Sequence, residues 1–254
     1  MAFLRLKKLK FKLNSMFYKS KIKKIINNIR NTANAQNENF ALTSLLKLFK
    51  DEAFFPLTNW SMAPSEILHI CNDILINKRV NIIEFGGGFS TLCIAQLIKI
   101  HDLDIKFTTV ENDLEWIEKI KSQLIMHKLG EIVNLVHAPI KPISKEFSYN
   151  NQEVWYDIEI INQLINQYSL VDLIIIDGPF GKLTPFARFS AIPVLLEKMA
   201  TNYAVFFDDT NRPDEMEIAK NWMKILNGNR RDFYRYTYFF SNNNFNSIPI
   251  LTII

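Results

Sequence analysis

Five short apolar runs alternate with helix-length segments through most of the chain, and this alternation restricts the possible fold more than any other feature. The runs are strand-sized and cover residues 80–85, 105–111, 131–138, 171–177 and 203–209. Helices are expected over residues 41–50, 64–77, 89–100, 113–128, 156–168, 184–200 and 213–227, with loops over 54–62 and 139–155. Because crossover helices bring successive strands into parallel order, the pattern predicts a parallel sheet covered by helices.

The C-terminal segment departs from this alternation. Residues 232–240 and 247–254 predict two strands, and the six residues between them leave no room for a helix. Two strands joined in this way form an antiparallel hairpin. We therefore expect the α/β class, with a Rossmann-like, mostly parallel seven-stranded sheet, a C-terminal antiparallel hairpin and a helical N-terminal extension.

The composition excludes several other classes of protein. The 254 residues are 48% hydrophobic and 22% charged, which excludes a disordered chain. No apolar run approaches the roughly 18 residues of a membrane-spanning helix. Cys71 and Cys93 lie far apart, without a Cys-x-x-Cys pair, which argues against a disulfide scaffold or a zinc knuckle. Two isolated cysteines are typical of a reducing compartment, so we expect a cytoplasmic protein.

The positive charge is concentrated at the N-terminus. Ten of the 30 basic residues precede residue 31, and the first acidic residue is Glu38. The rest of the chain has 20 basic and 26 acidic residues, so the body is mildly acidic and the net charge of +4 comes from the N-terminal arm. A basic arm on an acidic body does not indicate a nucleic-acid-binding protein, and no nucleic acid partner is expected.

Apolar residues within this arm recur at spacings of three and four, at Phe3, Leu6, Leu9, Leu13, Met16 and Phe17. With lysines between them, they predict an amphipathic helix with a cationic face. Four partners remain open for the arm: an anionic membrane surface on the inner face of the membrane, bound through residues 1–30; the body of the protein; a second subunit in a homodimer; or nucleic acid or another anion. Polar residues 31–39 predict a linker, which divides the chain into an arm and linker (1–39) and one domain (40–254).

The most specific motif is a glycine-rich turn, Glu84-Phe85-Gly86-Gly87-Gly88-Phe89-Ser90, between a strand and a helix. Glycines at such a turn let the backbone approach a ligand closely. The third glycine of a dinucleotide fingerprint is replaced by Thr91, and Glu84 repels a pyrophosphate but attracts an ammonium group. Glu111 ends the next predicted strand, where a carboxylate accepts hydrogen bonds from ribose hydroxyls.

These motifs resemble those of class I S-adenosylmethionine-dependent methyltransferases, over roughly residues 60–254. The segments FPLTNWSMAP, EFGGGFSTL, VENDLEWIEKI, VHAPI, LIIIDGP and FFDDTNRPDE are similar to bacterial O-methyltransferases found with glycan or secondary-metabolite genes. Ser90 stands where the superfamily usually has a third glycine. The resemblance implies methyl transfer from S-adenosylmethionine to an oxygen of a small molecule or glycan precursor.

The resemblance also implies a role for each part of the cofactor site. Glu84 would hold the methionine ammonium group, directly or through water, and the glycine turn would line the methionine moiety. Glu111 would bind the ribose, the end of the third predicted strand would contact adenine, and Ser61 would close over the cofactor. The expected cofactor-binding residues are Ser61, Glu84, Gly86, Gly88, Ser90, Glu111, Asn112, His137, Ala138 and Asp177.

Three aspartates end neighbouring predicted strands: Asp177 ends the fourth, and Asp208 and Asp209 end the fifth. Parallel strands bring such residues to one sheet edge, where three carboxylates need a positive partner. Mg²⁺ or another divalent cation prefers oxygen ligands of this type and would activate an acceptor hydroxyl. The alternative is that Asp177 only closes the cofactor site while Asp208 caps the following helix.

The catalytic base is less well defined by the sequence. Asp177 and Lys182 are the candidate catalytic residues, with His137 as a rival, although methyl transfer from a sulfonium depends more on positioning than on a base. Arg188 and Arg212 are candidates for binding an anionic acceptor or for forming salt bridges with nearby acids. Two other classes remain as alternatives: a non-catalytic binding module on the same fold, and a nicotinamide-dependent oxidoreductase.

Overall fold

The computed structural model describes residues 2–49 and 56–250, and side chains from residue 21 onward except residues 27 and 30. The helices are α1 (Ala2–Leu46), α2 (Pro64–Asn77), α3 (Phe89–Ile100), α4 (Leu114–Met126), α5 (Ile158–Ile165), α6 (Ala191–Leu195), the 3₁₀-helix η1 (Leu196–Lys198) and α7 (Pro213–Ile225). The strands are β1 (Asn81–Phe85), β2 (Lys106–Glu111), β3 (Val133–His137), β4 (Ile140–Pro142), β5 (Val154–Tyr156), β6 (Val171–Ile176), β7 (Met199–Phe207), β8 (Asn229–Asp232) and β9 (Thr237–Phe240).

The main sheet has seven strands in the order β3-β2-β1-β6-β7-β9-β8. Strand β1 pairs in parallel with both β2 and β6, and β9 runs antiparallel to both β7 and β8. This confirms the expected Rossmann-like, mostly parallel sheet with an antiparallel C-terminal pair. The chain moves outward from β1 to β3 and then returns to the other side of β1. Ligands bind at the carboxyl ends of the strands where the order reverses in this way, which here lies between β1 and β6.

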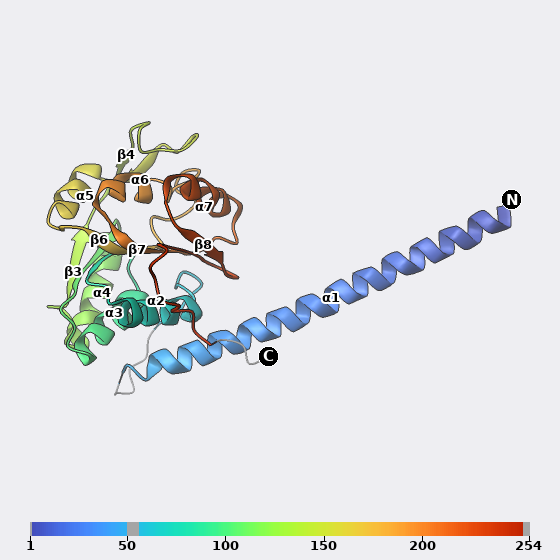
Figure 1. Ribbon diagram of the computed structural model, residues 1–254, viewed down its shortest axis with the longest axis horizontal. Coiled ribbons are helices and arrows are strands. Elements are labelled where there is room, and N and C mark those ends of the chain that lie inside the picture. Colours follow the sequence, from blue (N-terminus) through green and yellow to red (C-terminus); the bar gives the residue numbers. More distant parts are fainter. Residues whose placement is uncertain (1, 50–55, 251–254) are drawn as a thin grey trace.

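Helices cover both faces of the sheet (Figure 1), and the central strands β1, β6 and β7 contribute side chains alternately to the two cores. On one face, Ile82, Leu173 and Phe206 pack with residues of α2 and α3. On the other, Ile83 and Phe207 pack with residues of α5, α6 and α7. The central strands are buried on both faces, which is why their sequences are continuously apolar.

Helix α1 contradicts the predicted linker. It runs without a break from Ala2 to Leu46 and passes through residues 31–39, and Figure 1 shows its N-terminal part projecting away from the sheet. Residues 31–39 contain no Gly or Pro to end a helix. The helix is also held at its far end, where Ala41 and Leu45 are buried. No helix among the described residues is long and apolar enough to cross a membrane.

Three other segments differ from expectation. Residues 139–155, predicted as a loop, contribute β4 and β5, which pair antiparallel in a small separate sheet. The helix predicted over residues 184–200 is reduced to α6 and η1, because turns occupy 184–190. The terminal hairpin is formed by β8 and β9, one segment earlier than predicted; residues 247–250 are not a strand, and 251–254 lie outside the described residues.

Candidate active site at the carboxyl edge of the sheet

The glycine turn between β1 and α3 approaches the turn after β6 very closely. Gly86 has a φ of +86°, and a Cβ there would lie 2.7 Å from the backbone N of Gly178. Gly88, in contrast, has no neighbouring atom within 4 Å of where its Cβ would lie. The first glycine is therefore required by the fold, whereas the third leaves open space in front of the N-terminus of α3, where backbone N–H groups favour polar or anionic ligand groups.

Glu84 lies beneath this turn and is fully buried. Its carboxylate accepts hydrogen bonds from the hydroxyls of Ser90 (2.6 Å), Thr91 (2.5 Å) and Thr109 (2.8 Å). Burial raises its pKa to about 7, and the three hydroxyls oppose this rise. Glu84 thus ties the end of β1 to β2 and to the first turn of α3, and its carboxylate is occupied by these hydroxyls.

Glu111, at the end of β2, forms the adjacent wall. Its carboxylate accepts hydrogen bonds from the backbone N–H groups of Asn112 (2.7 Å), Asp113 (3.1 Å) and Gly87 (3.3 Å). Burial raises its pKa, although these three donors lower it. The indole N–H of Trp116 donates to the Gly87 carbonyl oxygen at 2.8 Å, so the glycine turn is fixed from this side as well.

A cavity of about 1160 Å³ extends along these residues. Most of the residues predicted to bind a cofactor line it: Ser61, Gly86, Gly88, Ser90, Glu111, Asn112 and Asp177. Glu84 is not a lining residue, and neither are His137 or Ala138. His137 instead contacts the Asn112 carbonyl oxygen through Nε2 (3.1 Å), and Ala138 is fully buried. Lys182 is exposed and also lies outside the lining, so the structure does not bring it to the other predicted residues.

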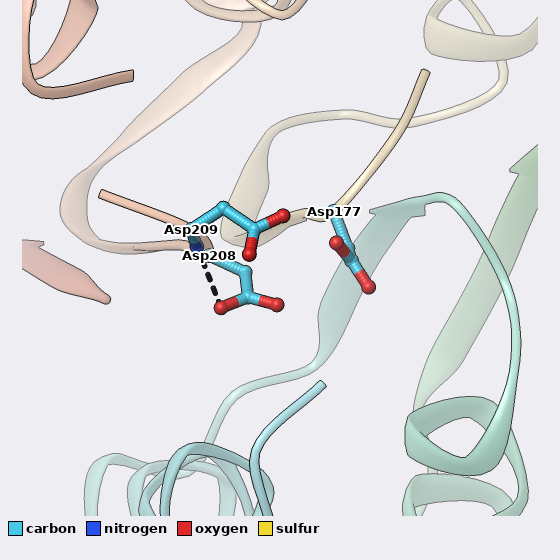
Figure 2. A group of neighbouring side chains, drawn as sticks. All are labelled: Asp177, Asp208 and Asp209. Carbon is cyan, nitrogen blue, oxygen red and sulfur yellow. Dashed lines mark hydrogen bonds between the residues drawn. The ribbon is translucent and has the colours of Figure 1, made fainter. Parts of the chain in front are cut away.

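The three predicted aspartates do come together at the sheet edge. Figure 2 shows Asp208 and Asp209, at the end of β7, facing Asp177 from the end of β6. One carboxylate oxygen from each lies within 4.8 Å of the others. Asp208 also accepts a hydrogen bond from the backbone N–H of Asp209 at 2.6 Å, and it does not cap the following helix, whose N-cap is Arg212. Burial raises the pKa of Asp177 and of Asp208, and their neighbouring carboxylates raise both further.

Arginines surround this cluster. Arg188, which is 4% exposed, contacts Asp177 (3.1 Å) and Asp209 (3.2 Å). Arg212 contacts Asp209 at 2.8 Å, and Arg235 lies 3.5 Å from Asp208 and 3.3 Å from Asp209. The sequence suggested salt bridges for the first two arginines as one of two alternatives, and the structure contains them. Burial lowers the pKa of Arg188, but the neighbouring carboxylates outweigh this effect and raise its pKa above the usual value.

Two charged residues of this site have no counterpart in the sequence-based prediction. Arg235 lies between β8 and β9 and reaches back across the sheet edge. Glu66, in the first turn of α2, is fully buried, and its pKa is raised well above its usual value by burial and by the nearby Asp208 and Asp177. Its position two residues after Pro64, in the first turn of the helix, is the one signal for it in the sequence.

Searches with the sequence gave no relatives: no family model matches it, and no curated protein matches it. Solved structures match at low identity. The SAH-bound methyltransferase PaMTH1 of Podospora anserina is 15% identical, with a TM-score of 0.53 over 83% of this chain and 88% of its own. The precorrin-6y C5,15-methyltransferase of Geobacter metallireducens GS-15 is 11% identical, with a TM-score of 0.50 over 76% and 96%.

Both similar structures are methyltransferases, and the similarity covers most of each chain. The chain therefore has a Rossmann-like methyltransferase fold, which confirms the fold that the sequence motifs resemble. A fold alone does not define a reaction, so the function must be argued from the residues of the site.

Proposed function

We propose that the chain is an S-adenosylmethionine-dependent methyltransferase that acts on an oxygen of a small molecule or glycan precursor. The observation that carries this proposal is the open space at Gly88, which faces a cavity with Glu111 on its wall. A close backbone approach next to a ribose-binding carboxylate suits an adenosine-containing ligand. PaMTH1, which shares the fold, is bound to SAH.

When bound, S-adenosylmethionine supplies an electrophilic methyl group, and the protein contributes mainly position. In this proposal Glu111 accepts hydrogen bonds from the ribose hydroxyls, and the backbone of Gly86 and Gly88 borders the methionine moiety. Ser61 closes the cavity from the loop before α2. Glu84 acts from beneath the turn, where it holds Ser90 and Thr91 in place. The adenine contacts of His137 and Ala138 remain a prediction.

The acceptor end of the cavity is formed by Asp177, Asp209 and the arginines beside them. Asp177 is the better-placed candidate base, because it lines the cavity and Lys182 does not. In donor type and spacing the three aspartates fit a hard divalent cation such as Mg²⁺. Such a cation would be held by Asp177, Asp208 and Asp209 and would lower the pKa of an acceptor hydroxyl.

One observation speaks against a nicotinamide-dependent oxidoreductase. Thr91 stands at the third glycine position, and its hydroxyl accepts a hydrogen bond from the Gly88 N–H (2.9 Å) while it donates to Glu84. A buried acid beneath the turn disfavours a pyrophosphate above it. A non-catalytic binding module would bind S-adenosylmethionine without turnover, so an activity measurement separates it from the proposed enzyme.

The N-terminal arm supplies a further part of the proposal. Ile22, Ile25, Ile26 and Ile29 recur at helical spacing in α1 and are 44–63% exposed. The ten basic residues in the first 30 favour an anionic membrane surface as the partner of this face, which would place the enzyme peripherally on the inner side of the membrane. A homodimer through α1 is the alternative.

Turnover with and without a chelator tests the catalytic proposal. Purified protein incubated with S-adenosylmethionine and a fractionated small-molecule extract is expected to release S-adenosylhomocysteine in some fractions. Excess EDTA is expected to abolish this release, and Mg²⁺ or Mn²⁺ to restore it. Full turnover in EDTA would contradict the metal-assisted mechanism and leave positioning with a protein base. Binding of S-adenosylmethionine without turnover in any fraction would favour the binding module.

A further inference from the structure

Glu66 has no ordinary structural task in the fold. It occupies the third position of α2, where a glutamate often reaches back to the N-cap backbone. No such bond forms at α2; instead Glu38 of α1 accepts hydrogen bonds from the Ser65 N–H (2.9 Å) and hydroxyl (2.6 Å). The N-terminus of α2 is therefore satisfied by α1, and the Glu66 carboxylate is free for another role.

The Glu66 side chain is fully buried, yet neither of its oxygens has a hydrogen-bond partner among the described residues. It faces Asp208, and two facing carboxyl groups form a hydrogen bond only when one of them carries a proton. Burying a carboxylate without a donor or a positive charge is costly, so such a group needs a ligand or a proton.

The charges around Glu66 are unbalanced. Four carboxylates, those of Glu66, Asp177, Asp208 and Asp209, face three guanidinium groups, those of Arg188, Arg212 and Arg235. Glu215, 3.9 Å from Arg212, adds another negative charge at the edge. The arginines therefore leave an excess of negative charge. The carboxylate without a hydrogen bond is that of Glu66, which is not one of the three predicted aspartates.

We propose that Glu66 is the fourth carboxylate of the divalent-cation site at the sheet edge, and that a bound Mg²⁺ or Mn²⁺ supplies the partner that its buried oxygens lack. This inference rests on the metal-assisted form of the proposed function. Carboxylates are the ligands that these cations prefer, and each added carboxylate strengthens the attraction of a buried site for a divalent ion. The site thus draws on α2 as well as on the ends of β6 and β7.

Binding of Mn²⁺ to the full-length protein, measured from the loss of the free Mn²⁺ electron paramagnetic resonance signal, tests this inference without any acceptor. Glu66→Gln is expected to weaken Mn²⁺ binding at least tenfold, while S-adenosylhomocysteine affinity changes less than twofold. Glu131→Gln, the same substitution at an exposed acid outside the cavity lining, is the control and is expected to bind Mn²⁺ like the wild type. Glu66→Asp, which keeps the charge on a shorter side chain, is expected to lie between Glu66→Gln and the wild type.

Melting temperatures distinguish a metal ligand from a merely structural residue. Mn²⁺ is expected to raise the melting temperature of the wild type but not that of Glu66→Gln, and in EDTA the variant is expected to melt no lower than the wild type. Unchanged Mn²⁺ affinity in Glu66→Gln, or no Mn²⁺ binding by the wild type, overturns the inference. If S-adenosylhomocysteine still binds in that case, the proposed methyltransferase function stands; if Mn²⁺ binds but S-adenosylhomocysteine does not, that function fails and the site remains.

Discussion

Gly86 and Gly88 are two residues apart but face different surroundings, so the same substitution tests two different roles. Gly86→Ala places a methyl group against the Gly178 backbone in a left-handed conformation and is expected to destabilise the fold by more than about 1–2 kcal/mol. Gly88→Ala meets no atom and has a φ of 176°, which any residue adopts, so stability is expected to stay near that of the wild type. Its methyl group enters the cavity, and S-adenosylhomocysteine affinity is expected to fall. Urea unfolding and calorimetry measure the two effects; equal behaviour of the two variants would contradict these roles.

Glu84 makes stability depend on pH in a specific direction. Its pKa is raised from 4.5 to about 7 in the fold, so the fold favours the neutral acid. The resulting stability is fully present below pH 4.5 and is lost as the pH rises toward 7. In the ligand-free protein, Glu84→Gln removes this titration, and the wild type is expected to lose up to roughly 3 kcal/mol more than the variant between pH 5 and 8. Urea unfolding at several pH values measures this difference. If the free energies of unfolding of the wild type and the variant depend on pH in the same way, the raised pKa of Glu84 is contradicted.

Residues near the sheet edge could be predicted from the sequence when they follow a recognisable strand. The ends of β1, β2, β6 and β7 place Glu111, Asp177 and Asp209 at one cavity, because parallel strands share an edge. Glu66 and Arg235 could not be found in this way, since they come from a helix start and from the turn of the hairpin. Lys182 lies outside the cavity lining, because closeness in sequence to Asp177 does not determine where a loop side chain lies.

Among the side chains of helix α1 that the structure describes, the buried ones, Ala41 and Leu45, lie near its C-terminal end, which predicts different results for two truncations. Deleting residues 2–30 is expected to leave the melting temperature and S-adenosylhomocysteine affinity unchanged, while binding to anionic liposomes is lost. Binding of the full chain to anionic liposomes is expected to weaken as salt is added. Deleting residues 2–46 also removes buried Ala41 and Leu45 and the Glu38 contacts to Ser65, and is expected to cost at least roughly 2 kcal/mol. If the shorter truncation destabilises the protein or dissociates a dimer, the arm acts by packing.

For elements with a clear hydrophobic periodicity and strong end signals, the sequence predicts the bounds to within a residue or two. Helix α2 begins at Pro64 and ends at Asn77 as expected, and α3 matches its predicted bounds. Elements that depend on distant partners could not: the β8 sequence Asn-Arg-Arg-Asp has no strand propensity and forms a strand because β9 pairs with it. In the same way, the polar residues 31–39 are helical because α1 continues to the contacts at its C-terminal end.

The reversal of strand order between β1 and β6 brings the candidate site residues together. The glycine turn follows β1, Asp177 follows β6, and the two turns are in backbone contact at Gly86 and Gly178. The cavity is lined by both turns, by Glu111, by Asp177 and Asp209, and by the three arginines beside these aspartates. In the proposed function, the cofactor and the acceptor meet at these strand ends, as a group transfer between them requires.

Calorimetric titration of the purified protein with S-adenosylhomocysteine and with NAD tests whether this cavity is an S-adenosylmethionine site. We expect S-adenosylhomocysteine to bind and NAD not to bind, and we expect Glu111→Ala to weaken S-adenosylhomocysteine binding by about 1–3 kcal/mol through loss of hydrogen bonds to a charged acceptor. Glu131→Ala, at an exposed acid outside the cavity lining, is the control and is expected to bind like the wild type. Binding of NAD, or equal S-adenosylhomocysteine affinity in Glu111→Ala and the wild type, would contradict the assignment of this cavity as an S-adenosylmethionine site.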